Sequence, residues 1–269
     1  IDTDRLEIAL RSGPKFLYVL PNFHNPAGTT LTVERRNRLV ELASHYGVPI
    51  LEDDPYGQLR YEGEHQPPLV EIDSEYHGER AGKAAAGGRF RGGVIYLSSL
   101  SKTLAPGLRI AWVVAPTDVI GRLVQIKQGA DLHTSTFNQM VAFETARGGF
   151  LDHHVKVLRD FYRQRRDAML EALKRYMPDG VEWTRPQGGL FLWLTLPAGD
   201  LQKVGAAAIL QEAVKSKVVF VPGSAFYPGP SADGSGERSM RLNFSYCTPE
   251  VIEVGIRRLS EVVGRALGA

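Results

Sequence analysis

The sequence VIYLSSLSKTLAPGLR, residues 94–109, is the most informative stretch of the chain. An apolar run reaches Ser99 and Ser101, Lys102 follows, and a Pro-Gly turn leads to Arg109. We expect a lysine at the end of a buried strand to be partly desolvated, which disfavours its ammonium form. A neutral amine can form a Schiff base with an aldehyde, and the hydroxyls and guanidinium suit a phosphate monoester. The stretch therefore suggests pyridoxal 5'-phosphate, although a lysine near a strand end can also simply reach solvent.

Two upstream segments have the same form, an apolar run followed by polar side chains. The run at 16–20 leads to Asn25 in PNFHNPAG, and the run at 48–51 leads to Asp53 and Tyr56 in EDDPY. Asn25 could instead only cap a turn, and the acidic residues could form a solvated loop. Because ligands of open α/β sheets bind at the carboxyl ends of the strands, three such ends favour one common site.

Four segments, PNFHNPAG, EDDPY, SLSKTLAPGLR and MRLNFS, occur in this order along the chain. In spelling and order they resemble the fold-type I, pyridoxal-phosphate-dependent aminotransferases of class I and II. The closest resemblance is to the 2-aminoadipate, kynurenine and aromatic aminotransferases, and it extends from Phe16 to the final helix. It implies an α/β fold: the mostly parallel sheet of a large, incomplete PLP-binding domain at residues 1–150, followed by a smaller α+β domain at residues 151–269.

The resemblance also implies roles for the residues around the cofactor ring. Lys102 would form the Schiff base and then act as the base that moves the proton from the substrate Cα. Asp53 would pair with the pyridine nitrogen and keep it protonated, which makes the ring an electron sink. Asn25 and Tyr56 would hydrogen-bond the phenolic oxygen of the ring.

Other residues would hold the phosphate and the substrate. Ser99 and Arg109 would bind the phosphate, with Ser101 a weaker candidate for the same role. Arg241 would clamp the α-carboxylate of the substrate together with Asn25, since its planar fork matches a carboxylate. An exposed arginine on an edge strand is the alternative interpretation of Arg241. No metal site is expected.

Composition narrows the function classes. The net charge of +2 over 269 residues implies no nucleic-acid partner, and Cys247, the single cysteine, excludes an intrachain disulfide. No apolar run approaches the roughly 18–20 residues of a membrane span, so we expect no membrane partner. The expected partners are an amino acid, a 2-oxo acid and a second copy of the chain, which would form a homodimer. The expected location is the cytoplasm.

The remaining pattern predicts the other elements. Thr32 is expected to cap a helix that ends at Gly47. Further expectations are a long connection at 54–91 with a mobile insertion at 81–93, a strand at 108–115, a helical pattern from Thr117, a helix at 136–177 interrupted near 148–149, a hairpin at 181–196, strands at 218–221 and 240–246, and a helix starting at Thr248 and Pro249.

The front of the chain departs from the family pattern. It begins at Ile1 and reaches the Asn25 segment almost at once. Family members carry a longer segment there, with a glycine-rich phosphate-binding turn, so we expect an N-terminally incomplete chain with an exposed sheet edge. Three functions stay open: an aminotransferase, the ligand-sensing half of a transcription regulator built on the same fold, and an inactive fragment.

Overall fold

The computed structural model describes residues 1–80, 92–198, 205–230 and 233–268. Most of the expected insertion at 81–93 therefore lies outside the described residues.

The chain forms two compact units. Unit 1 comprises residues 1–22 and 30–157, and unit 2 comprises residues 23–29 and 158–269. The division falls inside a helix rather than at residue 150, and the short segment that carries Asn25 groups with the C-terminal residues.

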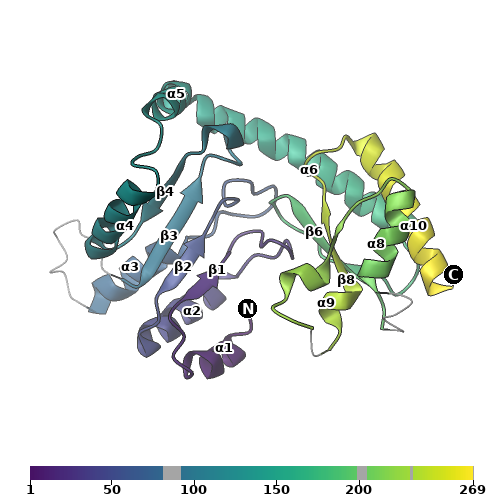
Figure 1. Ribbon diagram of the computed structural model, residues 1–269, viewed down its shortest axis with the longest axis horizontal. Coiled ribbons are helices and arrows are strands. Elements are labelled where there is room, and N and C mark those ends of the chain that lie inside the picture. The colour runs from purple at the N-terminus through teal and green to yellow at the C-terminus, as the bar shows by residue number, and fades with distance from the viewer. Residues whose placement is uncertain (81–91, 199–204, 231–232, 269) are drawn as a thin grey trace. The chain divides into compact units, whose positions relative to one another are not determined.

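Unit 1 is built on a four-stranded sheet (Figure 1). Its strands are β1 (Leu17–Val19), β2 (Ile50–Asp53), β3 (Val94–Ser99) and β4 (Ala111–Val114), in the order β1-β2-β3-β4. The first three strands are parallel and β4 runs antiparallel to β3. The mostly parallel α/β sheet expected for this part of the chain is confirmed.

Three helices supply the core of unit 1: α1 (Thr3–Leu10), α2 (Val33–Tyr46) and α3 (Leu69–Arg80). Their apolar side chains cluster with Val19, Ile50 and Val94 from the sheet. The prediction for α2 is confirmed, because the Thr32 hydroxyl accepts a hydrogen bond from the Arg35 amide and Gly47 ends the helix in the left-handed region.

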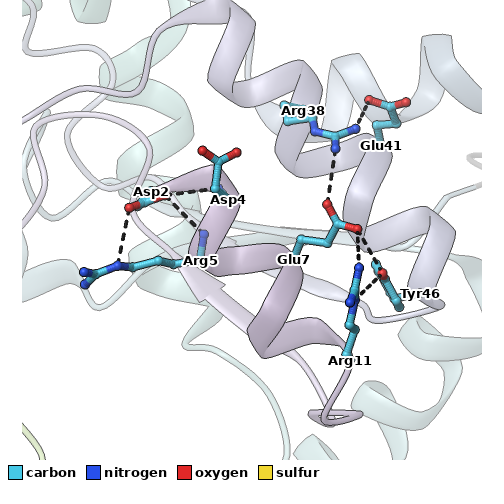
Figure 2. A network of polar contacts seen from close by, with 8 residues as sticks. All are labelled: Asp2, Asp4, Arg5, Glu7, Arg11, Arg38, Glu41 and Tyr46. Carbon is cyan, nitrogen blue, oxygen red and sulfur yellow. Dashed lines mark hydrogen bonds and ion pairs between the residues drawn. The ribbon is translucent and has the colours of Figure 1, made fainter.

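Helix α1, which the sequence analysis did not predict, joins α2 through polar contacts (Figure 2). The Glu7 carboxylate lies 3.2 Å from Arg11 and 3.5 Å from Arg38 and accepts a hydrogen bond from the Tyr46 hydroxyl. Because these groups are largely exposed, the ion pairs contribute little to stability. Burial of Leu10 is the stronger reason for the position of α1.

The long connection expected at 54–91 contains a helix, α3, that was not predicted. Pro67 and Pro68 immediately precede this helix. The Glu52 carboxylate accepts hydrogen bonds from the Leu69 and Val70 amides and so satisfies two donors of the first turn. Glu52 lies on strand β2, 17 residues before Leu69, so no pattern close to the helix predicts this cap.

The strand expected at 108–115 is shorter in the structure. A 3-10 turn occupies Pro106–Leu108, and Arg109 takes a left-handed conformation before β4 begins. Strand β4 is exposed along its length, and exposed apolar side chains also lie on the next two helices, α4 (Thr117–Ala130) and α5 (Thr136–Ala146). The unit therefore presents an apolar surface around its β4 edge.

The long helical region divides as expected. Helix α5 is followed by a 3-10 turn at Arg147–Gly149 and then by α6 (Phe150–Tyr176). Gly148 has a φ of 79°, so the break sits at the glycine pair. Within the described chain, no helix combines the length and the apolar character that crossing a membrane requires.

Unit 2 contains an antiparallel sheet in the order β5-β6-β8-β7. Its elements are β5 (Glu182–Trp183), β6 (Phe191–Thr195), α8 (Ala206–Lys215), β7 (Val221–Pro222), a 3-10 turn (Gly223–Phe226), α9 (Ser235–Arg238), β8 (Ser239–Asn243) and α10 (Pro249–Leu267). The predicted hairpin and the predicted final helix are confirmed. The strand expected at 218–221 overlaps the observed strand at a single residue, because β7 begins at Val221.

Candidate active site

The strand register of unit 1 places Asp53 and Ser99 on one face of the sheet. Ile50 and Val94 are register partners and belong to the core beneath the helices. Side chains alternate between faces, so Asp53 and its partner Leu97 point to the opposite face. Ser99, two residues after Leu97, shares that face. A carboxylate and a hydroxyl therefore lie at the carboxyl ends of adjacent parallel strands.

Tyr18 joins this pair from β1. It is the register partner of Leu51 and so lies on the same face as Asp53. Its hydroxyl donates a short hydrogen bond to Asp53 Oδ2. Partial burial raises the pKa of the Tyr18 phenol, and the hydrogen bond to Asp53 raises it further. Tyr18 was not predicted as a site residue, although its place between Leu17 and Val19 in a strand indicates the face that it occupies.

The two acids beside Asp53 point into a buried network. Glu52 is fully buried, and burial raises its pKa to about 7, although two backbone amides and Arg36 favour the charged form. Burial also raises the pKa of Asp54, whose carboxylate accepts hydrogen bonds from Asn22 (3.1 Å) and Tyr96 (3.4 Å). These contacts fix the end of β2 on both sides of Asp53.

Arg36 of α2 closes this network. Its guanidinium is fully buried and donates to the carbonyls of Pro21, Leu31 and Pro67 and to Asn22 Oδ1. The arginine thereby links the segment before Asn25 with the segment before α3. Nothing in the local sequence distinguishes this arginine from the exposed arginines around it.

The segment after β3 forms a tight turn. The Ser101 amide donates to Ser99 Oγ at 3.2 Å, and the Leu104 and Ala105 amides donate to the Leu100 carbonyl. Lys102 is half-buried within this turn. A hydroxyl that accepts one hydrogen bond still carries a proton to donate, so Ser99 retains a donor for a phosphate oxygen.

Arg109 and Tyr56 have different surroundings. Arg109 is exposed, and its Nη1 donates to the Pro106 carbonyl at 3.2 Å. Tyr56 is 6% exposed and lies in the bend that follows β2. Among the described residues, no group of three or more His, Cys, Asp or Glu side chains is placed to hold a metal ion.

Unit 2 brings Asn25 and Arg241 together. Arg241 lies on β8, and its Nη1 donates to Asn25 Oδ1 at 2.7 Å. The guanidinium carbon is 4.3 Å from the ring centroid of Phe191 and 5.2 Å from that of Phe226. Two aromatic rings and an amide therefore surround the arginine fork, and no sequence pattern linked Phe191 to Arg241.

Two glycines explain why the Asn25 segment joins unit 2. Gly28 has a φ of +68°, and a Cβ there would lie 2.6 Å from the Phe191 carbonyl oxygen. Gly189 has a φ of +72°, and its Cβ would lie 2.5 Å from Cβ of Phe23. Only glycine permits both the backbone conformation and the close approach. These contacts fasten the loop against the β5–β6 hairpin.

The residues present suit pyridoxal 5'-phosphate. Asp53 offers a carboxylate for a protonated ring nitrogen, Lys102 an amine for the aldehyde, and the turn after β3 offers hydroxyl groups for the phosphate. The family model for aminotransferase class I and II matches residues 1–259. The chain belongs to this family.

Individual members of the family are similar over nearly the whole chain. Aromatic-amino-acid aminotransferase 1 of Thermococcus litoralis is 45% identical over 93% of this chain and 54% of its own length. The crystal structure of LysN, the alpha-aminoadipate aminotransferase of Thermus thermophilus, has a TM-score of 0.86 and 39% identity, covering 99% of this chain and 63% of that one. That structure contains N-(5'-phosphopyridoxyl)-L-leucine.

A regulator is also similar. The uncharacterized HTH-type transcriptional regulator YisV of Bacillus subtilis is 33% identical over 95% of this chain and 47% of its own length. The chain thus spans between about half and two thirds of the length of these relatives.

Proposed function

We propose that this chain is the larger part of a pyridoxal-phosphate-dependent aminotransferase. The reaction would move an amino group from an amino acid to a 2-oxo acid in two half-reactions. The observation that carries the proposal is the shared sheet face of Asp53 and Ser99, with Lys102 three residues beyond Ser99. Family membership supports the same conclusion.

The bound cofactor would act as the electron sink for the carbanion at the substrate Cα. Lys102 would hold the aldehyde carbon covalently and, once released from it, would move the proton from the substrate Cα to that carbon. Asp53 would keep the ring nitrogen protonated through its negative charge. Tyr56 would donate its hydroxyl proton toward the phenolic oxygen of the ring, and Asn25 would donate from its amide.

Phosphate and carboxylate would bind at separate groups of residues. Ser99 and Ser101 would donate to the phosphate oxygens, and Arg109 would exchange its contact with the Pro106 carbonyl for one with the phosphate. In unit 2, Arg241 would bind the substrate carboxylate in a bidentate way. Its aromatic neighbours would keep the fork from rotating away, which reduces the entropy lost on binding.

We propose amino acids with aromatic or large aliphatic side chains as donors. The Thermococcus relative is named for aromatic amino acids, and the Thermus structure holds a leucine adduct. By resemblance, 2-oxoglutarate is the proposed acceptor, and 2-aminoadipate and kynurenine belong in the same screen. A homodimer in the cytoplasm is proposed on the family resemblance alone, and light scattering tests the dimer.

The ligand-sensing half of a regulator is the second candidate, because a regulator shares 33% identity with this chain. The spellings PNFHNPAG and EDDPY favour the enzyme. The two candidates differ in turnover, since a sensor binds the cofactor and an amino acid without releasing a 2-oxo acid. An inactive fragment would give neither stable cofactor binding nor turnover.

The first experiment adds pyridoxal 5'-phosphate to the purified chain and records the visible spectrum. Borohydride reduction and peptide mapping then locate the cofactor. We expect reduced cofactor on Lys102 and its loss in Lys102→Ala, while Lys127→Ala, a change of an exposed lysine, leaves the labelling intact. Label scattered over surface lysines would contradict the proposal.

Turnover with amino acid and 2-oxo acid pairs separates the enzyme from the sensor. We expect Lys102→Ala to abolish transamination. Asp53→Asn should retain most of the cofactor binding yet severely slow removal of the Cα proton, measured by exchange of Cα deuterium in single-turnover reactions. An unchanged exchange rate would remove Asp53 from its proposed role.

A further inference from the structure

Tyr18 is a conspicuous polar group on the sheet face that carries Asp53. It comes from the neighbouring strand β1, and the residue is 57% exposed. An exposed tyrosine ring has little packing to hold it in one position. Its hydroxyl nevertheless donates a short hydrogen bond to Asp53 Oδ2.

This contact complements the network on the other side of the strand. Glu52 and Asp54 are fixed by α3 amides and by Asn22 and Tyr96 on the covered face. These bonds hold the backbone of the end of β2, but they do not touch the Asp53 carboxylate. The Tyr18 hydroxyl therefore restrains the Asp53 side chain, which the hydrogen bonds on the covered face of the sheet do not contact.

We infer that Tyr18 is a positioning residue that holds one carboxylate oxygen of Asp53 so that the other is directed at the pyridine nitrogen of the cofactor. The inference rests on the proposed function. Tyr18 acts through Asp53 and needs no contact with substrate.

A double-mutant cycle tests the inference. The dissociation constant of pyridoxal 5'-phosphate is measured for the unsubstituted chain, Tyr18→Phe, Asp53→Ala and the double variant. We expect Tyr18→Phe to weaken binding about fivefold when Asp53 is present, because the freed carboxylate must then be ordered when the cofactor binds, and less than twofold when Asp53 is absent. Because the ring is exposed, the phenylalanine leaves no cavity, and the melting temperature should fall only slightly, as the loss of one exposed hydrogen bond allows.

Tyr46→Phe is the matched control. Its hydroxyl also donates to a carboxylate, that of Glu7 at 3.2 Å, but in the contact between α1 and α2. This variant should bind the cofactor unchanged. A second readout needs no cofactor: in alkaline titration of the tyrosine absorbance, Asp53→Ala should lower the pKa of one tyrosine, and this change should be missing when residue 18 is phenylalanine.

The outcomes separate the two proposals. No binding of the cofactor at Lys102 by the unsubstituted chain would overturn the proposed function and this inference with it. Binding at Lys102 with equal losses from Tyr18→Phe in both backgrounds, or with no loss, would overturn the inference alone. A fivefold loss that depends on Asp53 would support it.

Discussion

Replacing Glu52 by glutamine should remove a pH dependence from the stability of unit 1. The Glu52 carboxyl is fully buried, and burial raises its pKa from 4.5 to about 7. The folded state therefore binds more protons than the unfolded chain between pH 4.5 and about 7, so this group makes the free energy of unfolding fall as pH rises through that range. The rise in pKa corresponds to about 3 kcal/mol.

Urea unfolding at pH 5, 6, 7 and 8, followed by circular dichroism, measures this effect. Relative to Glu52→Gln, the unsubstituted chain should lose up to about 3 kcal/mol between pH 5 and pH 8. Asp73, whose pKa burial also raises, does not interact with Glu52 and therefore cancels in the difference. Hydrogen exchange of the Leu69 amide, which donates to Glu52, gives a local readout at the start of α3.

Glu71→Gln is the control for this prediction. Glu71 lies in the first turn of α3, the helix that Glu52 caps, but it is exposed. The same chemical change there should therefore leave the pH dependence of the free energy of unfolding unaltered. A difference between Glu52→Gln and the unsubstituted chain that stays constant from pH 5 to pH 8 would refute the argument, because it would mean that Glu52 keeps its charge throughout.

Two further predictions concern stability. Gly28→Ala should lower the free energy of unfolding by about 2 kcal/mol more than Gly13→Ala, because both glycines have a φ of +68° but only Gly28 places a Cβ against the Phe191 carbonyl; equal losses in urea titrations would contradict this. Arg36→Met should lower the free energy of unfolding by about 3 kcal/mol or more, because it leaves buried carbonyls without a donor. Arg35→Met, a change of an exposed arginine, should lower it by less than about 1 kcal/mol. Similar melting temperatures for the two variants would count against the buried network.

Local chemistry accounts for the parts of the fold that could be predicted. Helix α2 carries its own cap at Thr32 and its own stop at Gly47, and the helical region after Thr136 carries its break at Gly148. The strand ends that lead to Asp53 and Lys102 were visible because apolar runs stop abruptly at polar residues. Each of these signals lies within a few residues of the feature that it predicts.

The features that were missed depend on residues far apart in the chain. Helix α3 is capped by Glu52, 17 residues before its first amide, and Arg36 binds carbonyls up to 31 residues away. The proximity of Asn25 and Arg241, separated by 216 residues, was expected only from the family resemblance. The contact between Tyr18 and Asp53 requires the register of β1 against β2, which neither strand contains by itself.

The sequence alone therefore determined the family, the α/β class and the order of the polar strand ends, because spelling, periodicity and turn residues are local properties. Only the tertiary structure decided which face Asp53 shares with Ser99 and Tyr18, and which aromatic rings flank Arg241. Those arrangements depend on strand register and on packing between distant segments. Side-chain alternation means that a register shift of one residue would move Asp53 to the other face of the sheet.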